Sequence, residues 1–417
     1  MRDLAVEFDA MTAQALTGLE GQGGLPRYFA AAFQMAQGIA RGRLDILLPD
    51  GRRFRVQGSQ PGYVAELAVH NPDFFARLIR DGDLGFAESY MEGWWSTPDL
   101  QALLDLVNDD NPALYDEVLP ARLVRAWERL RHWMRANSKA QARRNIAYHY
   151  DLGNDFYSMW LDDSMTYSSA LFETGQESLQ AAQKAKYAAM VDRMGVQPGQ
   201  HVLEIGCGWG GFAEYAAAER GLNVTALTIS QAQHDYAVQR MEKAGLSDRV
   251  EIRLQDYRDT TGRFDGIASI EMFEAVGESY WPRYFRAVQE RLKPSAKAVI
   301  QIIMVPDMRF SSYRKHIDFI QKYIFPGGML GAPSPVRRVA ESAGLAYVAT
   351  HDFGQSYSET LRRWHREFTA RWPEIAALGY DLRFRRMWEF YLTSCASAFR
   401  TGSCDVTQLV LERPAQP

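Results

Sequence analysis

The stretch His201-Val-Leu-Glu-Ile-Gly-Cys-Gly-Trp-Gly-Gly-Phe212 decides the fold of this chain. Its first part, Val202 to Ile205, is apolar and contains β-branched residues, as a strand covered on both faces requires. The glycines at 206, 208, 210 and 211 let the backbone turn sharply and approach a ligand closely. The stretch therefore predicts a buried strand, a ligand-binding turn and a helix. Glu204 lies just before the turn, where its carboxylate can meet a positively charged or hydroxylated ligand.

The sequence around this stretch alternates between strand and helix patterns. Ser230 is a natural N-cap for a helix over 231–244. The alternation predicts an α/β fold with a doubly wound, mostly parallel sheet, which binds ligands beyond the carboxyl ends of its strands. An excursion over 316–330 predicts a helical cap. The predicted strands after the first are 223–229, 250–254, 264–270, 298–303 and 346–350.

The 417 residues allow roughly two or three domains. The pattern of residues 1–110 predicts a smaller α+β domain that could face lipid. We expect helices in the first 40 residues, with a break at Gly21-Gln-Gly-Gly24, and a β-hairpin that turns at Pro49-Asp-Gly51. Residues 111–145 predict a basic helical connector, either a solvated helix or a patch for phospholipid headgroups. Residues 146–417 form the predicted catalytic domain.

Composition restricts where the protein acts and what it binds. The net charge of −4 gives no general attraction to nucleic acid or anionic lipid. The three cysteines show no paired or metal-type spacing, and such sparse use is typical of a reducing cytoplasm. The chain has neither a signal-peptide pattern nor an apolar run near the roughly 18 residues that span a membrane. We therefore expect a cytoplasmic protein that at most rests on the inner membrane surface, with no metal.

The glycine turn is compatible with two kinds of cofactor. A dinucleotide-binding fold would have an acidic residue at the end of the second strand to hold a ribose. Here that strand ends in Thr228-Ile-Ser230, without a carboxylate. The pattern Glu-x-Gly-x-Gly-x-Gly-Gly resembles the nucleotide-binding loop of class I S-adenosylmethionine-dependent methyltransferases, a class that holds the adenine where Gln255-Asp256 lies. We therefore expect S-adenosylmethionine.

A narrower resemblance runs in order from Tyr148 to about Phe399, roughly two thirds of the chain. Together with the glycine stretch, six further motifs resemble the cyclopropane-fatty-acyl-phospholipid synthase family, which includes the mycolic acid cyclopropane synthases. These motifs are Leu152-Gly-Asn-Asp-Phe-Tyr157, Met165-Thr-Tyr-Ser168, Leu227-Thr-Ile-Ser230 with Gln233, Leu254-Gln-Asp-Tyr-Arg-Asp259, Glu271-Met-Phe-Glu-Ala-Val-Gly277 and Lys322-Tyr-Ile-Phe-Pro-Gly-Gly328.

The resemblance implies methyl transfer to the cis double bond of an acyl chain, in the type members one carried by an intact phospholipid. The implied partners are unsaturated phospholipid acyl chains and a membrane surface. A homodimer stays open, because the sequence does not give the oligomeric state. The cofactor-binding residues that it implies are Tyr148, Tyr167, Ser168, Glu204, Gly206, Gly208, Gly210, Gly211, Thr228, Ser230, Gln233, Gln255, Asp256, Tyr257 and Glu271.

The resemblance also implies a bicarbonate ion as the base that removes a proton after methyl transfer. Its family ligands carry over to Glu274, Tyr357 and the backbone of Ile303, whereas Ser169 replaces a cysteine and Gln301 replaces a histidine. Ser and Gln still form hydrogen bonds with an anion, but Gln cannot carry a proton as His can. We expect aromatic faces to tolerate the cationic intermediate. The candidates are Tyr167, Phe273, Tyr323 and Tyr357.

The position of the base decides the product. Loss of a proton from the new methyl group closes a cyclopropane, which the resemblance favours. Loss from the neighbouring chain carbon leaves an uncyclised methyl- or methylene-branched chain, the main alternative. Two further alternatives are a lipid carrier without activity and a methyltransferase acting on N or O of a small molecule.

Overall fold

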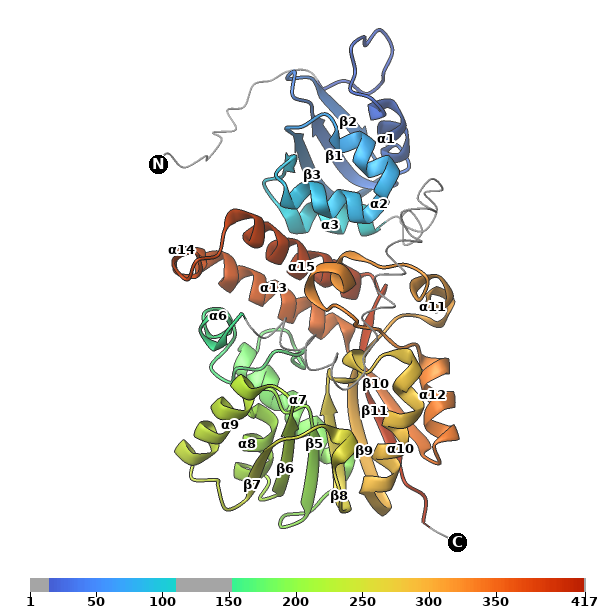
Figure 1. The fold of residues 1–417 in the computed structure, drawn as a ribbon. Helices are drawn as coiled ribbons and strands as arrows, with labels where there is room; N and C mark the ends of the chain where they lie inside the picture. Colours follow the sequence, from blue (N-terminus) through green and yellow to red (C-terminus); the bar gives the residue numbers. More distant parts are fainter. Residues whose placement is uncertain (1–14, 110–151, 416–417) are drawn as a thin grey trace. The chain divides into compact units, whose positions relative to one another are not determined.

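The computed structural model describes residues 15–109 and 152–415 (Figure 1). These residues fall into two compact units, one on each side of the undescribed segment 110–151. The predicted basic connector over 111–145 and the predicted cofactor ligand Tyr148 lie outside the described residues.

The first unit has a four-stranded sheet in the order β2-β1-β3-β4. The predicted hairpin is confirmed, since β1 and β2 pair antiparallel around Pro49-Asp-Gly51. The predicted break at Gly21-Gln-Gly-Gly24 is confirmed, but the predicted helix is wrong for residues 15–20 and 25–28, which include Gly18 and Pro26. The elements are α1 (Phe29–Ala36), β1 (Arg41–Leu47), β2 (Arg53–Gln57), β3 (Gln60–Val69), α2 (Phe74–Met91), β4 (Trp95–Ser96) and α3 (Leu100–Asp109).

The second unit has a seven-stranded sheet in the order β10-β11-β9-β8-β5-β6-β7. All neighbouring strands pair in parallel except β11, which is antiparallel to both β9 and β10. The predicted doubly wound, mostly parallel sheet is thus confirmed, but β11 was not predicted. The strands are β5 (His201–Ile205), β6 (Asn223–Thr228), β7 (Val250–Leu254), β8 (Phe264–Ile270), β9 (Leu292–Met304), β10 (Ala346–Asp352) and β11 (Asp405–Glu412).

Helices cover both faces of this sheet (Figure 1). One face packs against α7 (Leu179–Met194) and α8 (Gly211–Ala218), with Met241 of α9 (Gln231–Lys243). The other packs against α10 (Trp281–Arg291) and α12 (Pro333–Ser342). Successive residues of β9 alternate between the faces, as the pleat of a strand requires: Ile300 and Ile302 join the α10 face, and Val299 joins the α7 face.

Of the predicted helical cap over 316–330, only residues 319–324 are helical. Several further helical segments, this turn among them, complete the second unit. They are α6 (Asn154–Ser158), α11 (Asp307–Tyr313), a π-helical turn (Ile320–Ile324), α13 (Gly354–Ala370), α14 (Trp372–Ala377) and α15 (Leu382–Arg400), with short 3₁₀ turns at Tyr257–Asp259, Phe273–Ala275 and Glu278–Tyr280. None of the helices in the part of the chain that the structure describes is both long and apolar enough to cross a membrane.

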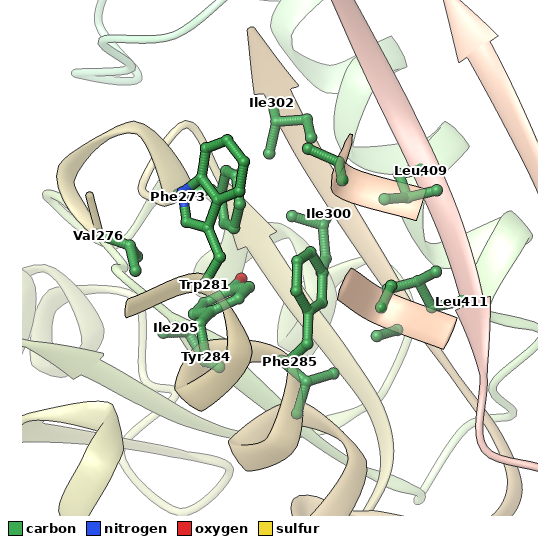
Figure 2. Packing of buried hydrophobic residues seen from close by; sticks show 14 of the residues in the cluster. Ile205, Phe273, Val276, Trp281, Tyr284, Phe285, Ile300, Ile302, Leu409 and Leu411 are labelled. Atoms are coloured by element: carbon green, nitrogen blue, oxygen red, sulfur yellow. The ribbon is translucent and has the colours of Figure 1, made fainter. Parts of the chain in front are cut away.

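Phe273 belongs to the core rather than to an exposed aromatic wall. Its ring is fully buried and lies 5.2 Å from the ring of Trp281 and 5.4 Å from that of Phe285 (Figure 2). This packing holds the turn after β8 against α10. Phe273, predicted as a candidate to stabilise a cation, therefore acts through packing.

We expect Phe273→Ala to lower the free energy of unfolding by about 3–5 kcal/mol, the usual cost of truncating a buried aromatic side chain. Urea unfolding of the full chain measures this change. Met308→Ala is the matched control, because Met308 is 89% exposed and its loss should change stability by less than about 0.5 kcal/mol. Equal stability of the two variants would contradict the packing role.

Candidate active site

The glycine turn between β5 and α8 has the backbone that the sequence predicts. Gly206, Gly208 and Gly210 have φ angles of +86°, +52° and +85°, which side chains with a Cβ rarely adopt. A Cβ at Gly206 would lie 2.8 Å from Cγ of Met272, whereas no described atom lies within 4 Å of a Cβ built at Gly208. The turn is therefore packed on one side and open beside Gly208, as a loop that cradles a ligand requires.

Glu204 places an uncompensated carboxylate at this turn. The residue is 1% exposed, and its Oε2 atom is buried without a hydrogen-bond partner among the described residues. Burial raises its pKa to about 8, although the charges of Lys186 and Arg240 oppose the rise. A cationic ligand would compensate this carboxylate, and S-adenosylmethionine carries both a sulfonium and an amino group.

The next two strand ends carry the other predicted cofactor residues. Thr228 Oγ1 donates to Gln233 Oε1 over 2.9 Å, and the Ser230 hydroxyl accepts from the backbone N–H of Gln233 as the predicted N-cap of α9. Asp256 follows β7 and forms a buried ion pair with Arg258 at 2.5 Å. The Asp256 carboxylate is thus held in place within its own turn. Gln255 and Tyr257 flank it.

A loop before α7 brings Tyr167 and Ser168 to the site. The Tyr167 hydroxyl shares a 2.7 Å hydrogen bond with that of Tyr391, and Ser168 Oγ accepts one of 2.7 Å from Lys186. Lys186 was not predicted. It is fully buried, and burial lowers its pKa to about 7 while the charges of Glu271, Asp162 and Glu204 oppose this. Its position in the apolar stripe of α7, between Ala182 and Met190, was the signal that could have found it.

The Glu271 carboxylate is the centre of the second half of the site. Its Oε1 atom accepts hydrogen bonds of 2.8 Å from the backbone N–H of Ser169 and from Gln301 Nε2. Its Oε2 atom accepts one of 2.6 Å from the Tyr357 hydroxyl. Glu271 was predicted as a cofactor ligand, but both its oxygens are engaged here. Its backbone has a φ of +48°, in the left-handed region that favours glycine, so the chain bends at the end of β8 to aim the side chain this way.

Glu274 follows three residues later in the chain, and its carboxyl group has a different hydrogen-bond partner. Its Oε1 atom accepts a 2.6 Å hydrogen bond from the backbone N–H of Ile303, and its Oε2 atom is buried with no partner among the described residues. Burial, together with the charge of Glu271, raises its pKa to about 8. Near neutral pH this carboxyl group therefore stays mostly protonated beside the Glu271 carboxylate.

The five residues expected to hold bicarbonate do lie together, but they do not fit that ion as predicted. Glu271 accepts from the backbone N–H of Ser169, the side-chain amide of Gln301 and the hydroxyl of Tyr357. Glu274 accepts from the backbone N–H of Ile303. The Ser169 hydroxyl donates to the carbonyl of Ala170 over 2.9 Å. These donors already have acceptors within the chain. The Glu271 carboxylate thus lies where the predicted anion would be bound.

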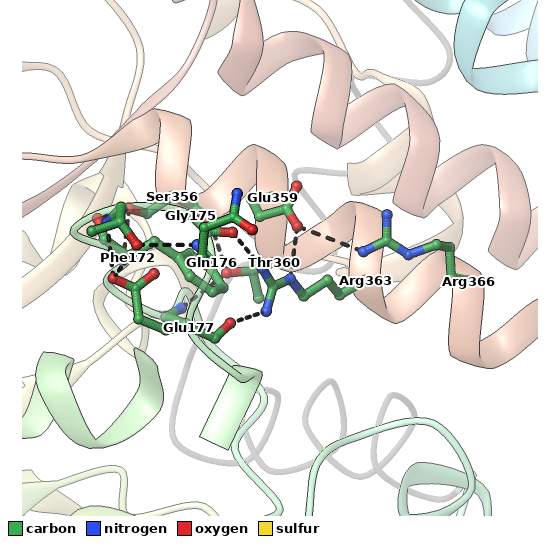
Figure 3. A network of polar contacts seen from close by, with 11 residues as sticks. Phe172, Gly175, Gln176, Glu177, Ser356, Glu359, Thr360, Arg363 and Arg366 are labelled. Atoms are coloured by element: carbon green, nitrogen blue, oxygen red, sulfur yellow. Dashed lines mark hydrogen bonds and ion pairs between the residues drawn. The ribbon is translucent and has the colours of Figure 1, made fainter. Parts of the chain in front are cut away.

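Hydrogen bonds join α13 to the loop 169–177 (Figure 3). The backbone N–H groups of Ala170 and Phe172 donate to the hydroxyls of Thr360 and Ser356, each over 3.1 Å. Arg363 donates to the carbonyls of Gly175, over 2.9 Å, and Glu177. Because Tyr357 lies on the same helix, these contacts fix its hydroxyl relative to the Ser169 N–H.

Aromatic rings pack around Tyr357, whose hydroxyl donates to the Glu271 carboxylate. The ring of Trp364 lies 5.3 Å from that of Tyr167 and 6.2 Å from that of Tyr357, which stacks on Phe399 at 4.4 Å. Tyr323, the remaining predicted candidate, packs 5.4 Å from Phe319 in the cap. Tyr357 is thus the aromatic residue in contact with Glu271, and the fully buried Trp364, which was not predicted, packs against both Tyr357 and Tyr167.

Comparisons with known proteins agree with this geometry. The family described as mycolic acid cyclopropane synthetase matches residues 137–409. The chain is 41% identical to the tuberculostearic acid methyltransferase of Mycobacterium tuberculosis, covering 90% of this chain and 88% of that protein. It is 38% identical to the cyclopropane-fatty-acyl-phospholipid synthase of Escherichia coli K12, covering 88% and 96%.

Solved structures give the same result for the second unit. A mycolic acid cyclopropane synthase complexed with SAH and CTAB matches with a TM-score of 0.61 and 29% identity, covering 65% of this chain and 98% of that one. The cyclopropane synthase MmaA2 of Mycobacterium tuberculosis matches with a TM-score of 0.61 and 28% identity over the same shares. S-adenosylmethionine is therefore the cofactor, and Glu204, the open turn and the strand ends fit it.

We expect Glu204→Gln to weaken S-adenosylmethionine binding by about tenfold to a hundredfold, since hydrogen bonds to charged groups contribute about 1.5–3 kcal/mol. Burial raises the pKa of Glu204 to about 8, and a bound cation favours the ionised form of this carboxyl group. Wild-type affinity should therefore increase between about pH 6 and about pH 9, and the variant should lose that increase. Calorimetric titration measures the affinity and its change with pH. Glu219→Gln is the control, because Glu219 is exposed. Wild-type binding by Glu204→Gln would show that Glu204 does not face the cofactor.

Proposed function

Since the chain belongs to the mycolic acid cyclopropane synthetase family and is an S-adenosylmethionine-dependent, lipid-modifying methyltransferase, we propose that it methylates the cis double bond of an unsaturated acyl chain in a membrane phospholipid. We also propose that Glu271 receives the proton that leaves after methyl transfer. The observation that carries this proposal is the convergence of Ser169, Gln301 and Tyr357 on the Glu271 carboxylate.

The residues of the chain supply what the chemistry requires. When bound, S-adenosylmethionine supplies an electrophilic methyl group, and its carbon–sulfur bond breaks as the alkene electrons form the new carbon–carbon bond. The neighbouring carbon of the acyl chain then carries a positive charge. The rings of Tyr167 and Tyr357, predicted for this role, offer polarisable faces to that charge, and the Glu271 carboxylate accepts the proton that restores neutrality.

Glu271 keeps one acceptor position for that proton. An ionised carboxylate offers about four lone-pair positions. Two donors occupy Oε1 and one occupies Oε2, so one position on Oε2 remains. Glu274 stays mostly neutral near pH 7, because its pKa is raised to about 8. Two neighbouring carboxyl groups with such different environments divide the roles between a base and a neutral partner.

The Glu271 carboxylate accepts the hydrogen bonds that we expected bicarbonate to accept. For this reason we favour the uncyclised product over the cyclopropane. Ring closure is the strained outcome and needs a base held at the new methyl group. Loss of a proton from a chain carbon next to the cation gives an unstrained methyl-alkene. A methylene branch forms instead when a hydride moves from the methyl-bearing carbon to the cation and the new methyl group then loses the proton. Because a side chain replaces the anion expected from ring-forming relatives, we propose a methyl-alkene or methylene-branched acyl chain. The relative named as a tuberculostearic acid methyltransferase supports this choice, and the relative named as a cyclopropane synthase keeps the ring as the second candidate.

The product is tested in a host that makes unsaturated phospholipid but no cyclopropane. We expect proton NMR of the extracted acyl chains to show vinylic signals and no ring protons far upfield. Mass alone cannot decide, because the two products are isomers. Upfield ring protons would contradict the uncyclised product, and unmodified chains would contradict methyl transfer to phospholipid altogether. The proposed action at a membrane surface is tested by measuring methyl transfer by the purified protein to phospholipid vesicles and to soluble amines and alcohols. We expect transfer to the vesicles alone.

We expect Glu271→Gln to reduce turnover by about 10²–10⁴-fold, the range for removing a general base. Affinity for S-adenosylmethionine should change by less than about threefold, because Gln cannot take the proton but keeps the size of the side chain. Turnover with vesicles and calorimetric titration give the two quantities. Glu367→Gln on the exposed face of α13 is the control. Near-wild-type turnover of Glu271→Gln would exclude Glu271 as the base.

Glu271→Gly tests whether the carboxylate fills an anion position. The φ of +48° suits glycine, so the backbone should persist while the donors of Ser169, Gln301 and Tyr357 lose their acceptor. We expect low turnover in bicarbonate-free buffer and recovery of at least about tenfold with added bicarbonate or formate. Glu271→Gln should show no recovery, because its side chain still occupies the space. Recovery in neither variant would contradict the anion position.

A further inference from the structure

A row of buried polar side chains crosses the α7 face of the large sheet. Gln301 of β9 and Gln408 of β11 are directly opposite each other in the antiparallel pairing, and both are 0% exposed. Their neighbours on this face, Val299 and Val410, are apolar core residues. Buried polar groups destabilise a core unless they are hydrogen-bonded, so this row needs a reason beyond packing.

A chain of hydrogen bonds runs through these two glutamines, from Arg193 of α7 to Glu271. Arg193 Nη1 donates to Gln408 Oε1. Gln408 Nε2 donates to Gln301 Oε1 over 3.1 Å, and Gln301 Nε2 donates to Glu271 Oε1 over 2.8 Å. Each amide thus accepts on one side and donates on the other.

The direction of this relay follows from the chemistry of its end. A guanidinium has only donors, so it binds the oxygen of Gln408 and turns the Gln408 NH₂ towards Gln301. Gln301 must then present its own oxygen to Gln408 and its NH₂ to Glu271. We propose that Arg193 is a positioning residue for methyl transfer: through Gln408 it fixes Gln301 as a hydrogen-bond donor to the Glu271 carboxylate.

The relay matters because Glu271 works only when ionised, and this inference rests on its proposed role as the base. Burial raises the pKa of Glu271, while hydrogen bonds from Tyr357, Gln301 and the Ser169 N–H lower it. The other charged groups near Glu271 are Lys186 of α7 and Glu274. If the Gln301 amide were reversed, its carbonyl would face the carboxylate and favour the protonated form.

Arg193 has charged or titratable neighbours on two elements. Asp192 precedes it on α7, and His351 of β10 is in register with Gln408. The pKa of His351 is lowered by burial and by the charge of Arg193, so His351 is mostly neutral near pH 7. Asp192 pairs with Arg220 at 2.6 Å. Arg220 is therefore a matched control, an arginine close to Arg193 but outside the relay.

The decisive variant is Gln408→Glu. A carboxylate at this position still pairs with Arg193 and keeps the size of the side chain, but it only accepts hydrogen bonds. Gln301 must then donate to it and turn its oxygen towards Glu271. Methyl transfer to phospholipid vesicles is measured across pH for the full-length wild type, Gln408→Glu, Arg193→Met, Arg193→Lys and Arg220→Met.

We expect the rising limb of the kcat profile to move to higher pH by roughly one unit in Gln408→Glu and Arg193→Met, as the loss of one hydrogen bond to a carboxylate predicts. Turnover at neutral pH should fall by roughly tenfold, and KM for lipid should hold. Arg193→Lys, which still only donates, should keep the wild-type profile, as should Arg220→Met.

A wild-type profile in Gln408→Glu would overturn the relay, because a purely structural glutamine predicts that result. If Arg193→Met does not fold, Gln408→Glu alone still tests the relay, because in that variant Arg193 is present and pairs with the new carboxylate. A wild-type protein that methylates no acyl chain at any pH would instead overturn the proposed function, so the two failures are distinguishable.

Discussion

The proposed active site depends on keeping one buried carboxylate, that of Glu271, ionised. Removing the Glu271 carboxylate from water without partners would destabilise the folded chain by several kcal/mol and would leave the group protonated. Three donors from three parts of the second unit oppose the rise in pKa that burial causes: they come from the loop before α7, from β9 and from α13. The site therefore forms only when these segments are all in place. The contacts of Arg363, Ser356 and Thr360 with the loop 169–177 serve the same condition, because they join two of the donors in one rigid group.

The two halves of the site have opposite electrostatic needs. Glu204 is buried beside an open turn and lacks a partner for Oε2 among the described residues, so it is suited to a cation that arrives from outside. Glu271 is satisfied from within and is suited to a proton from the substrate. Lys186 lies near both carboxylates and moderates the charge of each. Because cofactor and substrate bring positive charge at different steps, this division keeps an excess of charge from being buried at either step.

Much of this arrangement could be predicted from the sequence, and the exceptions have physical reasons. The glycine turn, the sheet and the grouping of Ser169, Gln301 and Tyr357 follow local patterns or the family resemblance. The role of Glu271 does not, because it depends on a backbone angle that no spacing reveals. Gln408 was missed together with β11, a terminal strand whose apolar pattern is interrupted by Thr407 and Gln408 themselves. The absence of helix over residues 15–28, where the structure describes the chain before Phe29, shows that glycine and proline can outweigh helical spacing.

The left-handed backbone at Glu271 has a consequence for the evolution of such enzymes. A position with a φ of +48° accepts glycine without strain, and glycine and glutamate codons differ by a single nucleotide. One substitution at this turn could therefore exchange a dissolved base for a covalently attached one while the fold persists. An enzyme with an attached base is independent of the supply of carbon dioxide in the cell. Its turnover would then follow the ionisation of Glu271, and so the pH, instead of the concentration of dissolved bicarbonate.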